Sequence, residues 1–277
     1  MTEALMREKI DQDPDVRPEW TLMAGRDRTA VGFIVALIRE TPEGERVGWI
    51  KLFCVTPAQR RQGTGTLLFD RIESELVRAG VQRIQVMDAV PNYWLPGIDP
   101  FCTEAVAFLE RRGYVKIDDT ANLIADLNQD LDTNSMEEEA RTGGVVCRRA
   151  RSGDLEEVIG MAGTEWPMWQ PEIEAAFKSS PITLHLAFID GRLSAFSAYS
   201  CNNISAGTFG PMGTLPRCRG KGVGGILLKR CLADLRAQGH GKAIIPWVGP
   251  IPFYMHYVNA RVQHVFWRYQ KAVDARG

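Results

Sequence analysis

The 277-residue chain lacks the features that define several large classes of protein. No apolar run approaches the roughly 20 residues that a helix needs to cross a bilayer, and the longest run, residues 31–38, lies between charged segments. The formal net charge is only −1, which leaves no electrostatic footprint for nucleic acid or an anionic membrane surface. The N-terminal segment, residues 1–15, is acidic and polar, unlike a secretory signal peptide. We therefore expect a cytoplasmic protein with no nucleic-acid partner and no membrane partner.

Cysteine and histidine are also scarce and scattered. The six cysteines form no C-x-x-C pair, and none of the four histidines lies at ligand spacing from a cysteine. We therefore expect no metal site. The thiols are predicted to be reduced and mostly buried, because several lie inside apolar segments. They are Cys54, Cys102, Cys147, Cys201, Cys218 and Cys231.

Two stretches of the chain are nearly the same. In each, an apolar strand is followed by a proline, a basic Arg-x-x-Gly-x-Gly turn and an amphipathic helix, at residues 55–68 and again at residues 214–228. The backbone N–H groups of such a turn and the positive end of the helix point at one spot, and the glycines let a ligand approach closely. Both turns are therefore predicted to hold a phosphorylated ligand, and their repetition predicts an internal duplication.

The hydrophobic pattern predicts the same order of elements in both copies from the strand pair onward. The first copy has strands at 20–25, 30–38 and 47–55, a helix at 63–79, a strand at 83–90, a helix at 103–112 and short strands at 114–117 and 123–127. The second has a strand at 145–149, helices at 155–162 and 172–178, strands at 182–189, 193–199 and 208–215, a helix at 222–236, a strand at 243–248, a helix at 253–258 and a strand at 262–269.

We predict two domains joined by a linker. The N-terminal domain is residues 1–127 and lacks its first strand and helix, because residues 1–19 are too short to form them. Either the first copy has lost these elements or the chain begins downstream of its natural start. Residues 128–144 carry few apolar side chains and end in two glycines, which predicts an acidic, flexible linker. Residues 145–277 are expected to form a complete C-terminal domain.

This order of elements, together with the two turns, resembles the GNAT superfamily of acyl-CoA-dependent N-acetyltransferases. The family's Arg/Gln-x-x-Gly-x-Gly/Ala signature is met by Arg60, Gly63 and Gly65, and again by Arg219, Gly222 and Gly224. The resemblance covers essentially the whole chain as a tandem pair. It implies an α/β (α+β) fold with two tandem GNAT-like domains, each a mixed, mostly antiparallel, splayed sheet flanked by helices.

The resemblance implies acetyl-CoA as the co-substrate. The turn amides would bind its pyrophosphate, basic side chains would add charge-assisted contacts, and the strand before each turn would pair with the pantetheine. Pro211 and Gly213 interrupt the second of these strands, as suits a bulge or a splay. The cofactor-binding residues implied are Val55, Arg60, Arg61, Gln62, Gly63, Thr64 and Gly65, and Leu215, Arg217, Arg219, Gly220, Lys221, Gly222, Val223 and Gly224.

The resemblance also implies direct attack of an amine on the thioester, with a tyrosine protonating the departing thiolate. Tyr254 falls at that place in the second copy, whereas Leu109 stands there in the first. At the end of the helix that carries Tyr254, Val258 and Asn259 stand where the family has a glycine followed by an aromatic residue. We therefore expect the second copy to be the catalytic one, with Tyr254 either the acid or an aromatic that packs on the sheet.

Several points stay open. The general base is not identified, because Glu165, Glu172 and Asp88 are each more typical of surface or capping carboxylates, and a lone histidine such as His256 is more often structural. Trp166 and Trp169 could line an acceptor site or simply pack. The acceptor could be an amine of a small molecule, a peptide or a protein, and the acyl group could be longer than acetyl. The chain could act as a monomer that imitates a dimer, or as a homodimer.

Three other functions could be read from parts of the sequence. The strongest alternative is a non-catalytic acyl-CoA-binding sensor or scaffold on the same fold. Residues 220–225 also match the dinucleotide fingerprint G-x-G-x-x-G, but residues 216–219 separate them from their strand, and the next strand, 243–248, has no acidic residue. Neither turn matches a P-loop, so an NTPase is disfavoured.

Overall fold

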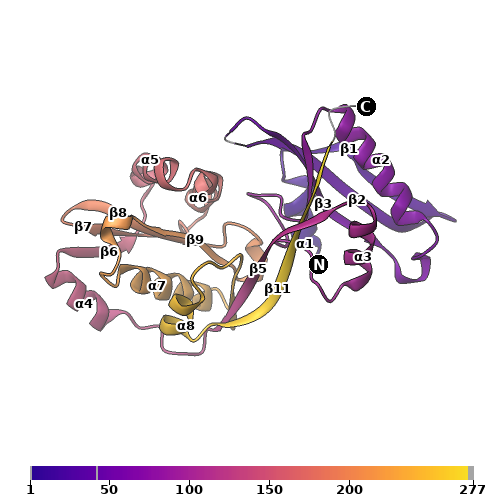
Figure 1. Cartoon of the computed structure of the whole chain (residues 1–277). Coiled ribbons are helices and arrows are strands. Elements are labelled where there is room, and N and C mark those ends of the chain that lie inside the picture. Colours follow the sequence, from indigo (N-terminus) through magenta and orange to yellow (C-terminus); the bar gives the residue numbers. More distant parts are fainter. Residues whose placement is uncertain (1, 42, 274–277) are drawn as a thin grey trace. The chain divides into compact units, whose positions relative to one another are not determined.

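The computed structural model describes residues 2–41 and 43–273 (Figure 1). The outer ends of the two predicted domains, residues 1 and 277, lie outside the described residues. The chain forms two compact units. Unit 1 comprises the ranges Met1–Thr120 and Val265–Gly277, and unit 2 is Ala121–His264. Within the described residues, no helix is long and apolar enough to cross a membrane.

Unit 1 is built around an antiparallel meander. Two short helical segments, α1 (Glu3–Met6) and the π-helical turn Arg7–Asp11, precede β1 (Val16–Arg26), β2 (Thr29–Glu40), β3 (Arg46–Val55), α2 (Thr64–Arg78), β4 (Arg83–Val86) and α3 (Thr103–Arg111). Strand β4 pairs in parallel with β3, so the sheet is mixed but mostly antiparallel. Helix α2 buries Phe69, Ile72 and Leu76 against the sheet residues Ile34 and Ile50, and each such side chain contributes about 1.5–3 kcal/mol.

Unit 2 contains a four-stranded antiparallel sheet with helices on both faces (Figure 1). Its elements are β6 (Val145–Arg149), α5 (Leu155–Glu165), α6 (Gln170–Lys178), β7 (Leu184–Ile189), β8 (Arg192–Tyr199), β9 (Phe209–Thr214), α7 (Val223–Ala237), β10 (Lys242–Ile245) and α8 (Ile251–Val258). Leu186 and Phe196 pack with α5 and α6, whereas Ala187 and Ala195 pack with α7. The strand period of two thus supplies both faces with apolar side chains.

Two strands each begin in one unit and end in the other. Strand β5 (Val115–Asp126) begins in unit 1, but its residues 123–126 pair antiparallel with β10 in unit 2. Strand β11 (Arg261–Ala272) begins in unit 2, but its residues 269–272 pair antiparallel with β4 in unit 1. The units are therefore not the two contiguous sequence segments, and the division of the sequence into copies at residues 127 and 145 stays a prediction. The two short strands expected at 114–117 and 123–127 are one continuous strand.

The expected flexible linker contains a helix, α4 (Asn134–Thr142). Arg230 on α7 donates two hydrogen bonds, of 2.8 and 2.6 Å, to the Glu137 carboxylate. Burial opposes ionisation of Glu137, but these bonds hold its pKa below the usual value. Ala140 also packs against buried residues of unit 2. Residues 134–142 thus form a helix with little apolar surface that an ion pair holds against α7, and the role of residues 128–144 as a linker stays a prediction.

The two units differ most in what precedes their hairpins. In unit 2, β6 opens the sheet and α5 and α6 cover one face of it. In the described part of unit 1, no strand precedes β1, and only α1 and the turn Arg7–Asp11 stand there.

Candidate functional site

The first glycine turn leaves its backbone donors free. After the short 3₁₀ turn Pro57–Gln59, Gly63 caps α2 in the left-handed conformation (φ 86°) with no side-chain cap. Within the described residues, no hydrogen bond engages the N–H groups of residues 61–65. These N–H groups stand at the N-terminus of a 15-residue helix, an arrangement that can accept an anion.

The second turn repeats this geometry. The 3₁₀ turn Pro216–Cys218 leads to Gly222, which caps the 15-residue helix α7 at φ 72°. Across the described chain, nothing accepts a hydrogen bond from the N–H groups of residues 220–224. Both turns therefore have the donors expected for a pyrophosphate.

The arginine that opens each signature braces the turn. Arg60 Nε donates to the Val55 carbonyl at 3.1 Å, and Arg219 Nε donates to the Thr214 carbonyl at 3.3 Å. Each side chain therefore ties its turn to the end of the preceding strand, a role that the sequence analysis missed. Arg26, at the end of β1, also donates to the Gln62 side chain at 3.0 Å. Only the pairing of β1 with β2, a tertiary feature, brings Arg26 to the turn.

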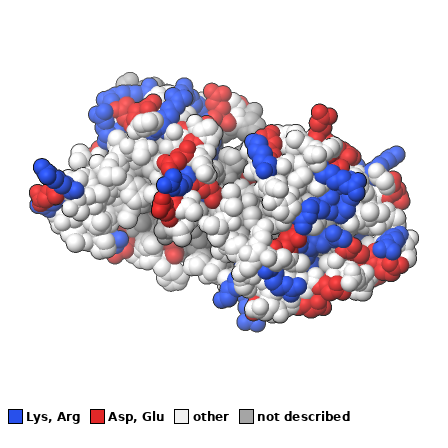
Figure 2. Space-filling model, turned by 180° about the vertical axis from the view of Figure 1, so that it is seen from behind, with Lys and Arg blue, Asp and Glu red and all other residues white. Residues whose placement is uncertain are grey.

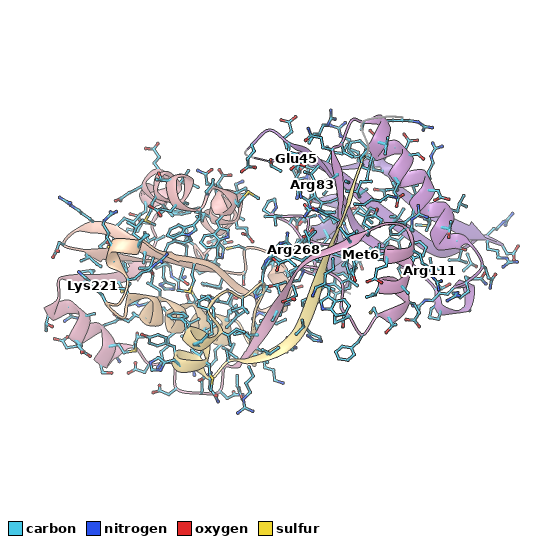
Figure 3. The ribbon with its side chains drawn as sticks, in the orientation of Figure 1. Met6, Glu45, Arg83, Arg111, Lys221 and Arg268 are labelled. Atoms are coloured by element: carbon cyan, nitrogen blue, oxygen red, sulfur yellow. The ribbon has the colours of Figure 1, made fainter. Side chains whose placement is uncertain are left out.

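Further basic side chains line each turn. Arg61 is exposed beside the first, and Arg217 and Lys221 are exposed beside the second. Lys221 extends from the turn before α7 (Figure 3). On the face drawn in Figure 2, Lys and Arg side chains alternate with Asp and Glu rather than forming one broad field. The basic side chains beside each turn could add charge-assisted contacts to a small anionic ligand.

The last glycine of each turn admits an aromatic ring from a later helix. A Cβ on Gly65 would lie 3.7 Å from Phe108 of α3, and one on Gly224 would lie 3.2 Å from Phe253 of α8. The residues after these phenylalanines are Leu109 and Tyr254. The two helices therefore occupy corresponding places beside their turns, and the corresponding position carries a hydroxyl in unit 2 and none in unit 1.

The sheet opens beside each turn. In unit 1, β3 pairs with β4 only from Val47 to Ile50, although β3 continues to Val55. In unit 2, a single bridge, Thr208 with Ile244, joins the start of β9 to β10. Beyond these points, no ladder partner within the described residues covers that edge of β3 or β9. An extended ligand could add itself there as a strand.

A β-bulge marks the closed end of each opening. A register shift between β2 and β3 leaves Lys51 as the extra residue, and a shift between β8 and β9 leaves Gly210 and Pro211. Lys51 and Gly210 each stand six residues before the proline of their turn. The bulge expected from Pro211 is present in unit 2, and unit 1 has a bulge at the corresponding place.

Tyr254 is suited to keep and donate a proton. Its side chain is 7% exposed and lies edge-on to Phe209 and Phe253, at ring distances of 6.1 and 5.0 Å. Burial raises the pKa of Tyr254 to about 12. No hydrogen bond to its hydroxyl is made within the described residues. In unit 1, Leu109 is fully buried in the core, where it can donate nothing.

Two tryptophans lie over β9. Trp166 and Trp169 stack at 5.4 Å with 20° between their planes, and both meet Phe196 edge-on. A Cβ on Gly213 would lie 2.7 Å from the Trp166 ring, so only glycine fits beneath it. Trp166 thus covers one face of β9 at Gly213, and Trp169 stacks on Trp166.

The carboxylates considered as general base have different surroundings. Glu165 and His256 are exposed. Asp88 is instead 2% exposed, and it accepts hydrogen bonds from Trp49 Nε1 at 3.2 Å and Arg268 Nε at 2.8 Å. Burial raises the pKa of Asp88 despite these partners. Asp88 is thus a buried, paired carboxylate and not a surface or capping one.

A buried polar network escaped the sequence analysis. In unit 2, His185 Nε2 lies 2.7 Å from Asp234 Oδ2, and Arg149 donates two 2.8 Å bonds to the same carboxylate. His185 is 3% exposed, and its Nδ1 has no partner. Burial lowers the pKa of His185, because a charged ring would leave an N–H unpaired. The sequence signal was a histidine inside the apolar run of β7.

The cysteines are free but less buried than expected. Cys218 and Cys231 are buried, Cys147 and Cys201 are intermediate, and Cys54 and Cys102 are exposed. The apolar segments around them predicted burial, but alternation along β3 turns Cys54 outward. Within residues 2–41 and 43–273, no group of three or more His, Cys, Asp or Glu side chains is placed to hold a metal ion.

Comparisons with known proteins agree with this geometry. Residues 2–94 match the model of the Acetyltransferase (GNAT) family. A GCN5-related glucosamine N-acetyltransferase region of a fungal multi-domain GH3 beta-N-acetylglucosaminidase superposes with a TM-score of 0.79 at 18% identity, over 96% of this chain and 36% of that one. The chain therefore spans about a third of that protein.

Two further structures match over more of their own length. A GCN5-related N-acetyltransferase from Sphaerobacter thermophilus has a TM-score of 0.69 at 17% identity, over 92% of this chain and 81% of that one. A tandem GNAT protein from the clavulanic acid biosynthesis pathway has a TM-score of 0.65 at 14% identity, over 97% and 93%. No curated protein matches the sequence significantly. The expected fold class and the likeness to the GNAT superfamily are confirmed.

Proposed function

Because residues 2–94 carry a GNAT-family domain and the whole chain has the GNAT fold, we propose that the protein transfers an acyl group from acetyl-CoA to a primary amine. The observation that carries this proposal is the pair of turns, each with five consecutive free N–H groups at the N-terminus of a 15-residue helix. Both turns bind the pyrophosphate of an acyl-CoA, and the open edges of β3 and β9 receive the pantetheine.

Unit 2 performs the transfer in this proposal. The neutral amine attacks the thioester carbonyl carbon at the bulge of β9, a C–N bond forms, the C–S bond breaks and the thiolate leaves. The nitrogen releases one proton to solvent, which replaces the proton that Tyr254 gives up. Tyr254, whose hydroxyl stays protonated because burial raises its pKa to about 12, gives its proton to the thiolate. The stacked Trp166 and Trp169 border the side from which the acceptor enters. Unit 1 lacks a hydroxyl at the equivalent position, Leu109, and carries out no acyl transfer to external amines.

The acceptor is a small-molecule, peptide or protein amine. One structural relative is named for a glucosamine N-acetyltransferase region, so amino sugars are the first acceptors to test. The proposal also places the protein in the cytoplasm. It is either a monomer with two similar units or a homodimer.

The test is calorimetric titration of acetyl-CoA into the wild type, Gly63→Asp and Gly222→Asp. Both glycines have positive φ and open space around their Cβ position, and aspartate tolerates this backbone while placing a negative charge in the anion site. Gly63→Asn and Gly222→Asn are matched controls without the charge. We expect each aspartate variant to lose one binding site and Gly222→Asp alone to lose turnover. No binding by folded wild type would overturn the proposal.

A non-catalytic acyl-CoA sensor or scaffold is the second candidate. Unit 1 favours it, because Leu109 replaces the acid and a helical segment stands where unit 2 has a strand and two helices. Release of free CoA thiol from acetyl-CoA, measured with a panel of amines, separates the two functions. If the protein binds acetyl-CoA but releases no CoA thiol with any amine of the panel, the result would favour the non-catalytic sensor or scaffold.

A further inference from the structure

A cluster of buried charges lies at the bulge of β3 in unit 1, and the proposed transfer does not use it. Lys51 and Asp13 are 0% and 3% exposed. Lys51 Nζ donates to Asp13 Oδ2, and Arg39 Nη2 donates to the two Asp13 oxygens at 2.9 and 2.8 Å. Asn92 Nδ2 donates to Asp13 at 3.3 Å. The chain thus holds a primary amine in a fixed place within the sheet.

That place is the closed end of the opening between β3 and β4. The strands pair as far as Ile50 with Val86, and the Met87 N–H donates to the Ile50 carbonyl at 2.9 Å. Lys51 is the next residue and the extra residue of the bulge. A pantetheine that runs along β3 from the turn would bring its thioester to this point. The counterpart in unit 2, Gly210, has no side chain, so unit 2 leaves space where unit 1 carries an amine.

The N-terminal segment closes this region around Lys51. Asp13 comes from that segment, and Lys9 of the same segment donates to Asn92 Oδ1 at 2.7 Å. Arg39 Nε also donates to Asp15 at 2.6 Å. Five side chains are thus tied together across the segment, β2 and the loop after β4. These contacts hold the amine of the bulge residue in one place beside Asp13.

We propose that Lys51 is itself an acyl acceptor, modified once by acyl-CoA bound at the first turn. This inference rests on the proposed binding of acyl-CoA by residues 61–65.

The step balances without a further reactant. The Lys51 ammonium loses one proton to solvent, and the neutral amine attacks the thioester carbonyl carbon. A C–N bond forms, the C–S bond breaks, and the second proton of the nitrogen passes to the departing thiolate. The products are an amide on Lys51, free CoA thiol and one proton. Asp13 and Arg39 position the amine but are unchanged.

The surroundings of Lys51 favour the neutral amine. Burial, reinforced by Arg39 and Lys9 and only partly offset by Asp13, lowers the pKa of Lys51 to about 8. The other charged groups in the network are Asp15, paired with Arg39, and Glu8, paired with Lys9. The rate of modification should therefore rise with pH up to about 8 and level off above it.

The experiment is mass spectrometry of the full chain after incubation with acetyl-CoA, with peptide mapping of the modified lysine. Calorimetric titration of the same samples reports binding at each turn. We expect one acetyl group on Lys51 in the wild type and in Gly222→Asp, and its loss in Gly63→Asp. Lys51→Arg should also lose it, while its guanidinium keeps a cation beside Asp13.

The outcomes separate this inference from the proposed function. Binding at the first turn without an acetyl group on Lys51 overturns the inference alone. No binding at either turn overturns both. Acetylation of Lys51 that persists in Gly63→Asp would not depend on the turn and would also overturn the inference. Gly63→Asn is the control for folding and should keep the acetyl group. If Lys51→Arg fails to fold, the wild type and Gly63→Asp still decide.

Discussion

The two glycine turns are close copies, whereas the sheet faces beside them are not. Both turns cap a 15-residue helix with a left-handed glycine and brace it with an arginine. Unit 2 adds a stacked tryptophan pair and a tyrosine, while unit 1 adds buried charges and a leucine. The turns thus share one geometry, while the side chains around them differ. Binding and turnover can therefore be tested separately within one chain.

The largest expected effect concerns the tyrosine that distinguishes the units. Tyr254→Phe removes a hydroxyl that has no hydrogen-bond partner in the described residues, so the fold should be unchanged. Loss of a general acid should lower kcat by about 10²–10⁴-fold with little change in acetyl-CoA affinity. Leu109→Val in unit 1 is the matched control and should leave kcat unchanged. Steady-state kinetics with an accepted amine measures both, and wild-type kcat in Tyr254→Phe would assign Tyr254 to packing.

The second prediction concerns the strand that unit 1 receives from the end of the chain. Tyr269 on β11 is fully buried and donates to Glu110 at 3.0 Å. Tyr269→Ala should destabilise unit 1 by about 3–5 kcal/mol, as for other large buried aromatics. Urea unfolding with hydrogen exchange measures this loss, which should be confined to unit 1. Val265→Ala, at an exposed position of the same strand, should change stability by less than about 0.5 kcal/mol. Equal loss in both units would show that they unfold together.

A smaller effect tests the tryptophan pair of unit 2. Gly213 lies under Trp166, and the equivalent residue of unit 1, Cys54, is exposed. Gly213→Cys should cost about 1–3 kcal/mol, because the ring must move to admit a side chain. Cys54→Gly should cost about 1 kcal/mol or less, the ordinary effect of glycine in a strand. Thermal unfolding of the two variants compares them. Equal destabilisation would contradict the difference between the two faces.

The smallest effect is a pH dependence of unit 2. Burial lowers the pKa of His185 below the ordinary histidine value of 6.5, so below pH 6.5 the unfolded chain binds a proton that the folded unit does not. Stability should therefore fall as pH drops from about 7 to 5.5, by about 1 kcal/mol per unit of pH at most. His185→Gln keeps a donor toward Asp234 and cannot titrate, so its stability should be flatter over this range. Parallel slopes for the two proteins would rule out His185 as the titrating group.

Much of the site could be predicted because its signals are local. A glycine at positive φ before an amphipathic helix encodes both turns, and the order of elements after each turn places Leu109 and Tyr254 in corresponding helices. The roles of Arg26, Asp13 and Arg268 could not be predicted. Each acts on residues far along the chain, and no local pattern records which strand will lie beside it.

The sequence by itself determined the helices, most strands, the two turns and their kinship, because 3.6- and two-residue periodicities and glycine conformations depend on near neighbours. Only the tertiary structure decided which strands complete each unit, where the helix of residues 134–142 docks, and which amine stands at the bulge of unit 1. These features depend on hydrogen bonds and ion pairs between residues far apart in the chain. Their energies arise only when folding brings those residues together.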